Sequence, residues 1–219
     1  MPTTKSQQPA LAAKKRPTQQ RATETYEKIL DVAARTLEEV GVERLSTNLV
    51  CERAGLTPPA LYRYFPNKYA LLCELGRRLM TSQNARVGQW LTLDVYRGTR
   101  TDLTHALEGL IIDTYQVTRD TVGGVWIMRA MRAVPAMQEV RLASHAAVSS
   151  GSADLLREAL PHANPDQILL LSQIAVELIY STVELLFDGP FDVREVARNV
   201  AEMMAYHLHR VGANVTTST

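Results

Sequence analysis

Residues 45–72, LSTNLVCERAGLTPPALYRYFPNKYALL, decide the fold of this 219-residue chain. Ser46 can cap one short helix, because its hydroxyl can accept a hydrogen bond from a free N–H of the first turn. Gly55 then stands where the chain must reverse, and glycine reaches the left-handed conformation without a Cβ clash. Thr57 can cap a second helix, which begins with the Pro58-Pro59 pair at positions whose N–H groups have no partner within the helix. Two helices joined by a glycine turn predict a helix-turn-helix.

A cluster of aromatic and basic side chains follows in the segment LYRYFPNK, residues 61–68. Tyr62, Tyr64 and Lys68 carry donors suited to phosphate oxygens. Asn67 can cap the next helix, whose N-terminal dipole also favours a phosphate. Caps, turn and cluster at fixed spacing are far more specific than a bare helix-turn-helix pattern. On these residues the chain resembles the DNA-binding domain of the tetracycline-repressor (TetR) family of bacterial transcription regulators.

Composition and hydrophobic spacing predict an all-α protein. Apolar residues recur at helical spacing throughout, glycine and proline fall mostly at expected helix ends, and no alternating strand pattern stands out. The net charge is only +1, but it is divided unevenly. Residues 1–68 hold eleven Lys and Arg against seven Asp and Glu, whereas residues 69–219 hold thirteen against sixteen. This division fits a basic domain that faces DNA and an acidic domain that stays away from the duplex. Charge by itself supports equally well an uneven surface charge that has no partner.

Three parts of the chain are expected. Residues 1–20 are polar, proline-containing and basic, so we expect a disordered arm that either contacts DNA or serves only as a solubilising tail. Residues 21–68 form the three-helix DNA-binding domain, with a first helix over about 23–40. Residues 69–219 form a helical domain for ligand binding and dimerisation. Its expected helices cover about 67–86, 101–120, 125–134, 137–160 with a possible kink at 149–151, 164–187 and 192–210.

The helix expected over 164–187 is apolar on most of its circumference, so it must be covered on more than one side. The resemblance implies that this helix and the last one pair with their copies across a two-fold axis. A bundle closed within one chain is the alternative. A homodimer would place two reading helices about 34–36 Å apart, which suits a palindromic operator in double-stranded DNA.

The resemblance assigns the DNA contacts by position. The base-facing candidates are Thr47, Asn48, Thr57, Pro58, Pro59, Ala60 and Arg63, and the phosphate-contact candidates are Tyr62, Tyr64 and Lys68, with Ser46 or Thr47 at the other end. Packing against the first helix is the alternative for both tyrosines, above all for Tyr64. The second helix carries few side-chain donors, so shape readout is expected to matter.

A small molecule is the expected second partner. Apolar, flexible or aromatic side chains suggest a pocket for an apolar or aromatic effector, with plain core packing as the alternative for each. These candidates are Tyr115, Trp126, Met128, Met131 and Met137. The predicted function is that of a ligand-responsive transcriptional repressor in the cytoplasm, with an effector-independent DNA-binding regulator as the alternative. Neither an enzyme, a cofactor nor a metal site is expected, and Cys51 and Cys73 are expected to be buried apolar residues.

Overall fold

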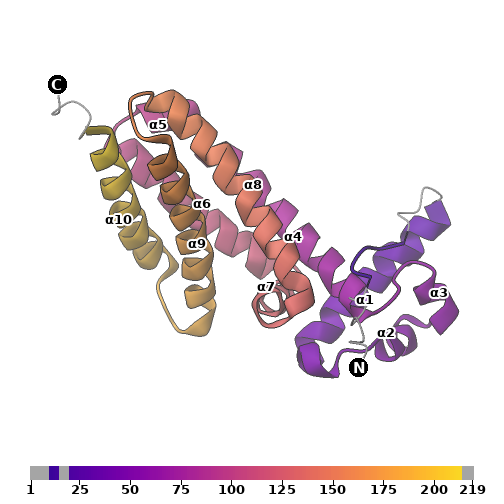
Figure 1. Ribbon diagram of the computed structural model, residues 1–219. Coiled ribbons are helices and arrows are strands. Elements are labelled where there is room, and N and C mark those ends of the chain that lie inside the picture. The colour runs from indigo at the N-terminus through magenta and orange to yellow at the C-terminus, as the bar shows by residue number, and fades with distance from the viewer. Residues whose placement is uncertain (1–9, 15–19, 214–219) are drawn as a thin grey trace, which may run out of the picture. The chain divides into compact units, whose positions relative to one another are not determined.

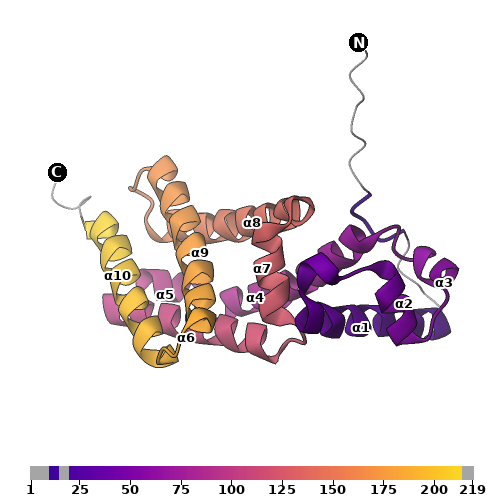
Figure 2. The same cartoon turned by 90° about the horizontal axis from the view of Figure 1, so that it is seen from below.

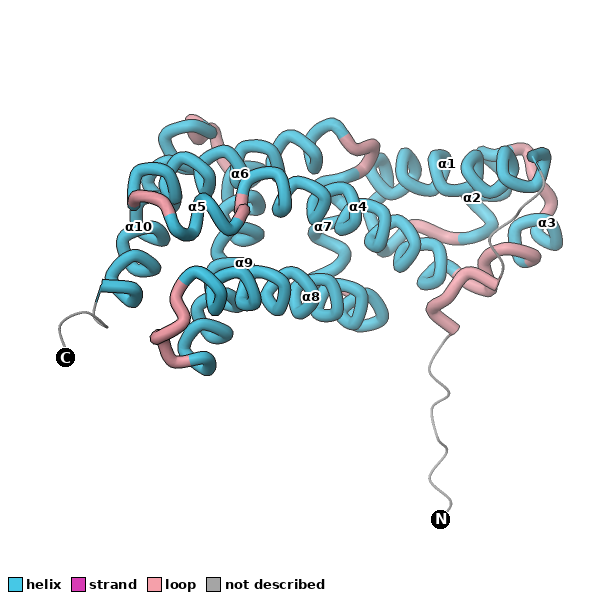
Figure 3. The backbone as a smooth tube through the Cα atoms, turned by 90° about the horizontal axis from the view of Figure 1, so that it is seen from above, coloured by secondary structure: helices cyan, strands magenta, loops and turns pink. Residues whose placement is uncertain are grey.

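The computed structural model describes residues 10–14 and 20–213, and these residues form helices and loops without a strand (Figure 3), which confirms the all-α prediction. The helices are α1 Gln20–Arg44, α2 Thr47–Ala54, α3 Pro58–Tyr62, α4 Lys68–Trp90, α5 Leu93–Arg97, α6 Arg100–Asp120, α7 Gly124–Ala133, α8 Pro135–Ala159, α9 Pro165–Asp188 and α10 Val193–Ala213.

The chain divides into two compact units. The head unit comprises the described residues up to Leu79 together with Thr121–Arg141, and the body unit comprises Met80–Asp120 and the described residues from Leu142 onward. The sequence suggested a boundary at residue 68, but the first half of α4 and all of α7 pack with the head. One reason is Gly76, whose missing side chain leaves room for Met131 and Met137 to approach within 3.1 and 3.2 Å of an ideal Cβ position.

An aromatic core holds the head unit together. The ring of Tyr26 on α1 stacks on Phe65 at a centroid distance of 4.9 Å and meets Tyr64 edge-on at 5.8 Å. Arg78 on α4 is tied to α1, because two of its guanidinium nitrogens donate to the carboxylate of Glu27 at 2.5 and 2.7 Å. Helix α1 contacts α2, and α2 contacts α3 (Figure 1). The ring contacts join α1 to the segment that follows α3 and so help to fix the α2–turn–α3 geometry.

The caps around the turn mostly follow the sequence. Ser46 accepts a hydrogen bond from Leu49 N, Gly55 adopts φ 62° at the end of α2, and Asn67 accepts from Ala70 N at 2.9 Å. Thr57 occupies the cap position of α3, but its side chain makes no capping hydrogen bond, contrary to the prediction. The hydroxyl is therefore not committed to the helix.

Other helix ends differ from the prediction. α1 is longer at both ends and runs past residue 41, where Gly41 at φ 73° interrupts the helical backbone. The short helix α5 lies between the helices expected over about 67–86 and 101–120, and Thr92 caps it by accepting a hydrogen bond from Val95 N. α8 is a single helix through residues 149–151, where Ser149 donates to the carbonyl oxygen of His145 at 2.7 Å.

The body unit is built around α6, α9 and α10, which contact one another (Figures 1 and 2). The end of α4 docks on α6 through Trp90: its ring occupies the space beside Gly109, and its indole N–H donates to Asp113 at 2.8 Å. α9 has the length and hydropathy of a membrane span, although core helices of soluble proteins pass the same test, and 44% of its most apolar window is buried.

Candidate functional site

The α2–α3 surface of the head carries most of the predicted DNA contacts at accessible positions. Exposed are Ser46, Asn48, Thr57, Pro58, Pro59, Tyr62 and Arg63; half-buried are Thr47, Ala60 and Lys68; and Tyr64 alone is buried. Leu61 on the opposite side of α3 is fully buried, as are Val50 and Ala54 on α2. Apolar residues thus hold both helices down while the polar candidates lie on the outer surface.

Tyr62 and Thr47 join the end of α3 to the start of α2. Their hydroxyl oxygens lie 3.0 Å apart, and either can be the donor. A pair of hydroxyls uses only one of its two protons for the mutual bond, so one proton remains for an outside acceptor. Together they offer one oriented donor that suits a phosphate oxygen.

Arg63 is held in place by Tyr64. Its Nη2 donates to the phenol oxygen of Tyr64 at 2.9 Å, and its guanidinium carbon lies 4.9 Å from that ring's centroid. Tyr64 is only 4% exposed, so it belongs to the aromatic core rather than to the outer surface. A guanidinium has five donors, and this bond leaves the others of Arg63 available to a base edge or a phosphate.

The described piece of the N-terminal arm, residues 10–14, contacts the same end of the head. Lys14 N donates to Tyr64 O at 2.8 Å, and the side chain of Asn67 donates to Ala10 O at 3.0 Å. The exposed Lys14 thereby stands near the segment that carries Lys68. The rest of the predicted arm, residues 1–9 and 15–19, lies outside the described residues.

The five predicted pocket residues do not form one site. Met128, Met131 and Met137 are buried in the head unit, at most 5% exposed. Trp126 is 39% exposed, beneath the guanidinium of Arg129. Tyr115 belongs to the body unit, where it stacks on Phe187 at 4.7 Å. The methionine pattern therefore reflects the packing of α7 and α8 in the head.

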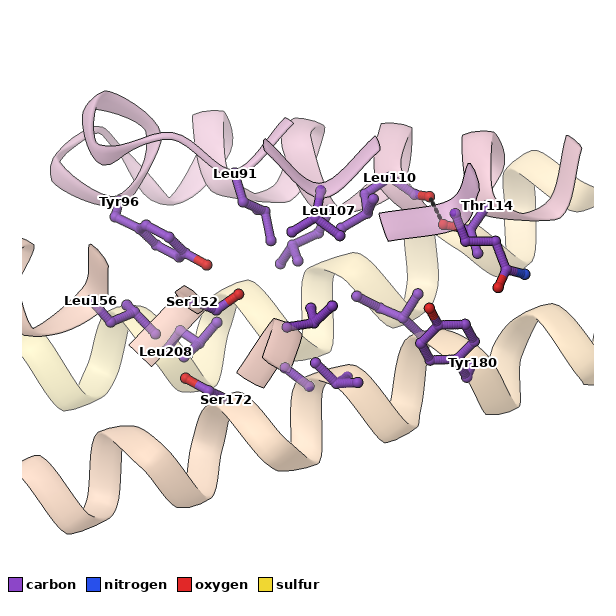
Figure 4. A pocket seen from close by; sticks show the side chains of 16 residues that line it. Leu91, Tyr96, Leu107, Leu110, Thr114, Ser152, Leu156, Ser172, Tyr180 and Leu208 are labelled. Carbon is purple, nitrogen blue, oxygen red and sulfur yellow. Dashed lines mark hydrogen bonds between the residues drawn. The ribbon is translucent and has the colours of Figure 1, made fainter. Parts of the chain in front are cut away.

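A cavity instead lies inside the body unit. Its walls come from α4, α5, α6, α8, α9 and α10, and about 30 Å³ is open to the centre of a water-sized sphere. Figure 4 shows Tyr96 and Ser152 at one end, Thr114 and Tyr180 at the other, and leucines between them. No Lys, Arg, Asp, Glu or His belongs to its lining. The space suits about two water molecules, so a larger occupant requires the walls to move apart.

The polar groups at the two ends are held by neighbours. Tyr180 donates to Asn84 Oδ1 at 3.1 Å, and its ring stacks on His145, whose Nδ1 lies 2.7 Å from Glu177. Burial is the main cause that raises the pKa of Tyr180. At the other end, burial raises the pKa of Tyr96 to about 12, against the opposing effect of its hydrogen bond with Ser152. Both phenols therefore stay neutral at ordinary pH.

Sequence reasoning missed these cavity residues. One signal was present in the sequence. Gln83 falls on the buried face of α4, three residues after Met80 and four before Val87, and a polar side chain on such a face requires a hydrogen-bond partner or a ligand. Serines and threonines on the buried faces of α6, α8 and α9 are a weaker signal, because they also satisfy backbone carbonyls within their own helices.

A second hollow lies on the surface of α9 and α10. This groove, of about 280 Å³, is lined by Leu171, Ile174, Ala175, Leu178, Thr182, Val200, Met203, Met204, His207 and Leu208. Leu170, Ile174 and Leu178 recur every four residues along α9 and are 41–55% exposed, while Met203 on α10 is 67% exposed. The exposed apolar row and the groove together form what we call the α9/α10 face.

The two cysteines are buried, as the sequence predicted. Cys51 and Cys73 are buried free thiols, and burial raises the pKa of both. Among the residues that the structure describes, no group of three His, Cys, Asp or Glu side chains could hold a metal ion.

Residues 29–75 match the family of bacterial regulatory proteins known as the tetR family. Over 55 residues the chain is 42% identical to the tetracycline repressor protein class C of Escherichia coli, a match that spans 25% of each protein. Residues 29–75 contain α2 and α3 with parts of α1 and α4, so the family match lies in the head.

Solved structures extend the likeness in fold to the body. A TetR-family transcriptional regulator from Streptomyces coelicolor is 26% identical with a TM-score of 0.57, over 85% of this chain and 99% of that one. SmeT, the repressor of the multidrug efflux pump SmeDEF of Stenotrophomonas maltophilia, has a TM-score of 0.63 over 83% of this chain and 88% of its own, at 18% identity.

Proposed function

We propose that this chain, a member of the TetR family by its DNA-binding domain, is a cytoplasmic repressor that binds a palindromic operator as a homodimer and releases it when a small apolar or aromatic molecule occupies the body cavity. The observation that carries the proposal is the α2–α3 surface. Its donors, among them the Thr47–Tyr62 pair and Arg63, stand on a buried aromatic base. A helix presented in this way suits the major groove.

The division of labour on that surface follows from its chemistry. The Thr47–Tyr62 pair, Lys68 and Lys14 suit phosphates, which fix the position of the protein on the duplex without reading sequence. Arg63 suits the O6 and N7 acceptors of guanine, because its planar fork is oriented by Tyr64. The Pro58-Pro59 pair offers only apolar contact, so much of the remaining specificity would come from DNA shape.

The α9/α10 face supports the homodimer. A row of exposed leucine and isoleucine side chains beside a groove is costly to leave in water, and a second copy of the same two helices would cover it. The same pairing sets the distance between two α3 helices and therefore the spacing of the operator half-sites.

The cavity supports control by a ligand. A ligand shifts an equilibrium only as far as it binds one conformer more tightly than the other. Because the cavity of this conformer admits about two waters, an effector of any size must favour a conformer whose walls stand further apart. In this wider conformer the distance between the two α3 helices of the dimer would no longer match the spacing of the operator half-sites.

The test begins with DNA fragments selected from the source genome by the full chain. Affinity for a selected fragment is then measured by fluorescence anisotropy for the wild type and for the triple variant Tyr62→Phe, Arg63→Gln, Lys68→Gln. We expect a loss of at least about a hundredfold, from three contacts of roughly 1 kcal/mol or more each. The control carries Arg97→Gln and Arg157→Gln in the body unit, so it also loses two positive charges but keeps the α2–α3 surface intact. Equal affinity of wild type and triple variant would refute the DNA-reading surface.

The dimer is tested by sedimentation. Leu178→Glu places a charge in the α9/α10 face and should yield monomers at micromolar concentration, because burying an unpaired carboxylate is unfavourable. Leu142→Glu is the matched control, since Leu142 is 48% exposed on α8 and does not line the groove. A dimeric Leu178→Glu variant would show that the copies pair elsewhere.

An effector-independent regulator of the same fold is the second candidate, favoured by the small volume of the cavity. It predicts that no apolar compound both raises the melting temperature of the protein and releases the selected DNA, whereas the ligand-responsive repressor predicts compounds that do both.

A further inference from the structure

We infer that the effector is a neutral, slender, mainly apolar molecule with a hydrogen-bond donor at one end, and that the side-chain oxygen of Gln83 accepts a hydrogen bond from this donor. The inference rests on the proposed effector role of the body cavity. It follows from the orientation of one amide, from the direction of the hydrogen bonds around the cavity, and from the charge of the lining.

The amide of Gln83 can lie in only one orientation. Its Nε2 lies 2.8 Å from Thr118 Oγ1, and Thr118 Oγ1 in turn donates to Thr114 O at 2.8 Å. Since the single hydroxyl proton of Thr118 is used by that carbonyl, its oxygen can only accept from Gln83. The nitrogen of the amide must therefore face Thr118, and Oε1 takes the other side.

Gln83 lines the cavity, and its Oε1 is a buried acceptor. The side chain belongs to a residue that is 1% exposed, and none of the residues that the structure describes donates a hydrogen bond to this oxygen. A buried carbonyl oxygen without a donor is unfavourable by about 1–3 kcal/mol. A ligand that brings a donor recovers this free energy, whereas a ligand with acceptors only does not.

The hydroxyl groups around the cavity strengthen this selection. Thr114 donates to Leu110 O at 2.7 Å, Ser172 donates to Ile168 O at 2.9 Å, and Tyr180 donates to Asn84 Oδ1 at 3.1 Å. Their protons are directed into their own helices or into a neighbour. These three hydroxyls consequently present oxygen lone pairs to the cavity. The Tyr96–Ser152 pair at the opposite end still keeps one proton for an acceptor, so the selection for a donor applies to the end of the cavity that holds Thr114 and Tyr180.

The charge and shape of the lining define the rest of the molecule. Because the lining holds no Lys, Arg, His, Asp or Glu and both of its tyrosines stay neutral, a carboxylate or ammonium would enter without a counter-charge, which is strongly unfavourable. Leu107 and Leu110 lie between the two polar ends (Figure 4), so the middle of the ligand must be apolar. A straight-chain primary alcohol has this combination of properties.

The experiment compares three ligands of equal chain length on the full wild-type protein: hexyl alcohol, hexyl methyl ether and hexanoate. Binding is measured by calorimetry and thermal shift, and release of the selected DNA by anisotropy. We expect the alcohol to bind about tenfold more tightly than the ether, the effect of one satisfied buried acceptor, and hexanoate to bind more weakly than either. An ether or a carboxylate that binds as tightly as the alcohol would overturn the inference without need of any variant.

Gln83→Met then tests the reading residue, because methionine keeps the length of the side chain and removes the acceptor. The preference for alcohol over ether should disappear in this variant. Gln89→Met is the matched control, since Gln89 is exposed on the same helix, and it should keep the tenfold preference. If the Gln83→Met variant still prefers the alcohol over the ether, Gln83 is not the residue that accepts the hydrogen bond of the ligand. If all three ligands bind but none releases DNA, the proposed repressor function fails while the ligand class stands.

Discussion

Two left-handed glycines in the head unit allow a matched test of how α7 is docked. Gly123 has φ 66° and precedes α7, and a Cβ built on it would lie 2.7 Å from the carbonyl oxygen of Ala34 on α1. Gly55 has φ 62° at the turn of the helix-turn-helix, and a Cβ there would meet nothing within 4 Å. Alanine at either site meets the same backbone strain, but only at residue 123 does it also meet α1.

The two costs can be separated. A non-glycine residue in the left-handed conformation costs about 1–2 kcal/mol, and this is the whole effect expected for Gly55→Ala. At Gly123 the oxygen that the new methyl group meets belongs to the backbone of a packed helix, so one helix must shift. Overpacking of this kind adds about 1–3 kcal/mol. We therefore expect Gly123→Ala to lower the free energy of unfolding of the head by about 2–5 kcal/mol.

Urea unfolding followed by circular dichroism and by tryptophan fluorescence measures the difference. Trp126 lies on α7, so its fluorescence reports on the element that Gly123→Ala should loosen. Operator affinity serves as a second readout, because α7 packs on α1, which supports the reading helices. If Gly123→Ala and Gly55→Ala lower the free energy of unfolding equally, the reasoning is refuted, because the contact between the new methyl group at residue 123 and the carbonyl oxygen of Ala34 would then add no cost.

Three further outcomes are expected. Tyr62→Phe should weaken binding to all duplexes about fivefold, the effect of one lost phosphate hydrogen bond, and a change confined to one base position would contradict this. Gly109→Ala places a methyl group 2.4 Å from the Trp90 ring and should lower the free energy of unfolding by about 1–3 kcal/mol, measured in urea; an unchanged midpoint would contradict it. Hydrogen bonds from Thr99 lower the pKa of Asp102, so its stabilising effect should be present above the ordinary carboxyl range and lost as pH falls through the lowered value. The stability difference between wild type and Asp102→Asn should accordingly vanish in acid, and a difference that persists there would contradict the assignment.

Local chemistry explains what the sequence could predict. Ser46, Gly55 and Asn67 act on backbone groups only a few residues away, so their roles were visible in one short segment. Leu61 also lies at helical spacing from the other apolar residues of the motif, which places it on the inner side of α3, and it is fully buried. Thr57 was the exception, because a capping residue can leave its hydroxyl unused when the backbone already satisfies the first turn.

The sequence by itself determined the helical class and the helix-turn-helix, because each depends on contacts between residues that are close along the chain. The aromatic core of the head joins Tyr26 to Tyr64 and Phe65, which are distant along the chain, so it became visible only in the tertiary structure. Only the tertiary structure decided where the cavity lies. Its lining joins Gln83 and Tyr96 to Ser172 and Leu208, which come together only when distant helices pack. For the same reason the methionines near residue 131 could not be told from a binding site by composition: what makes them core is the glycine at residue 76, which lets α4 come close to them.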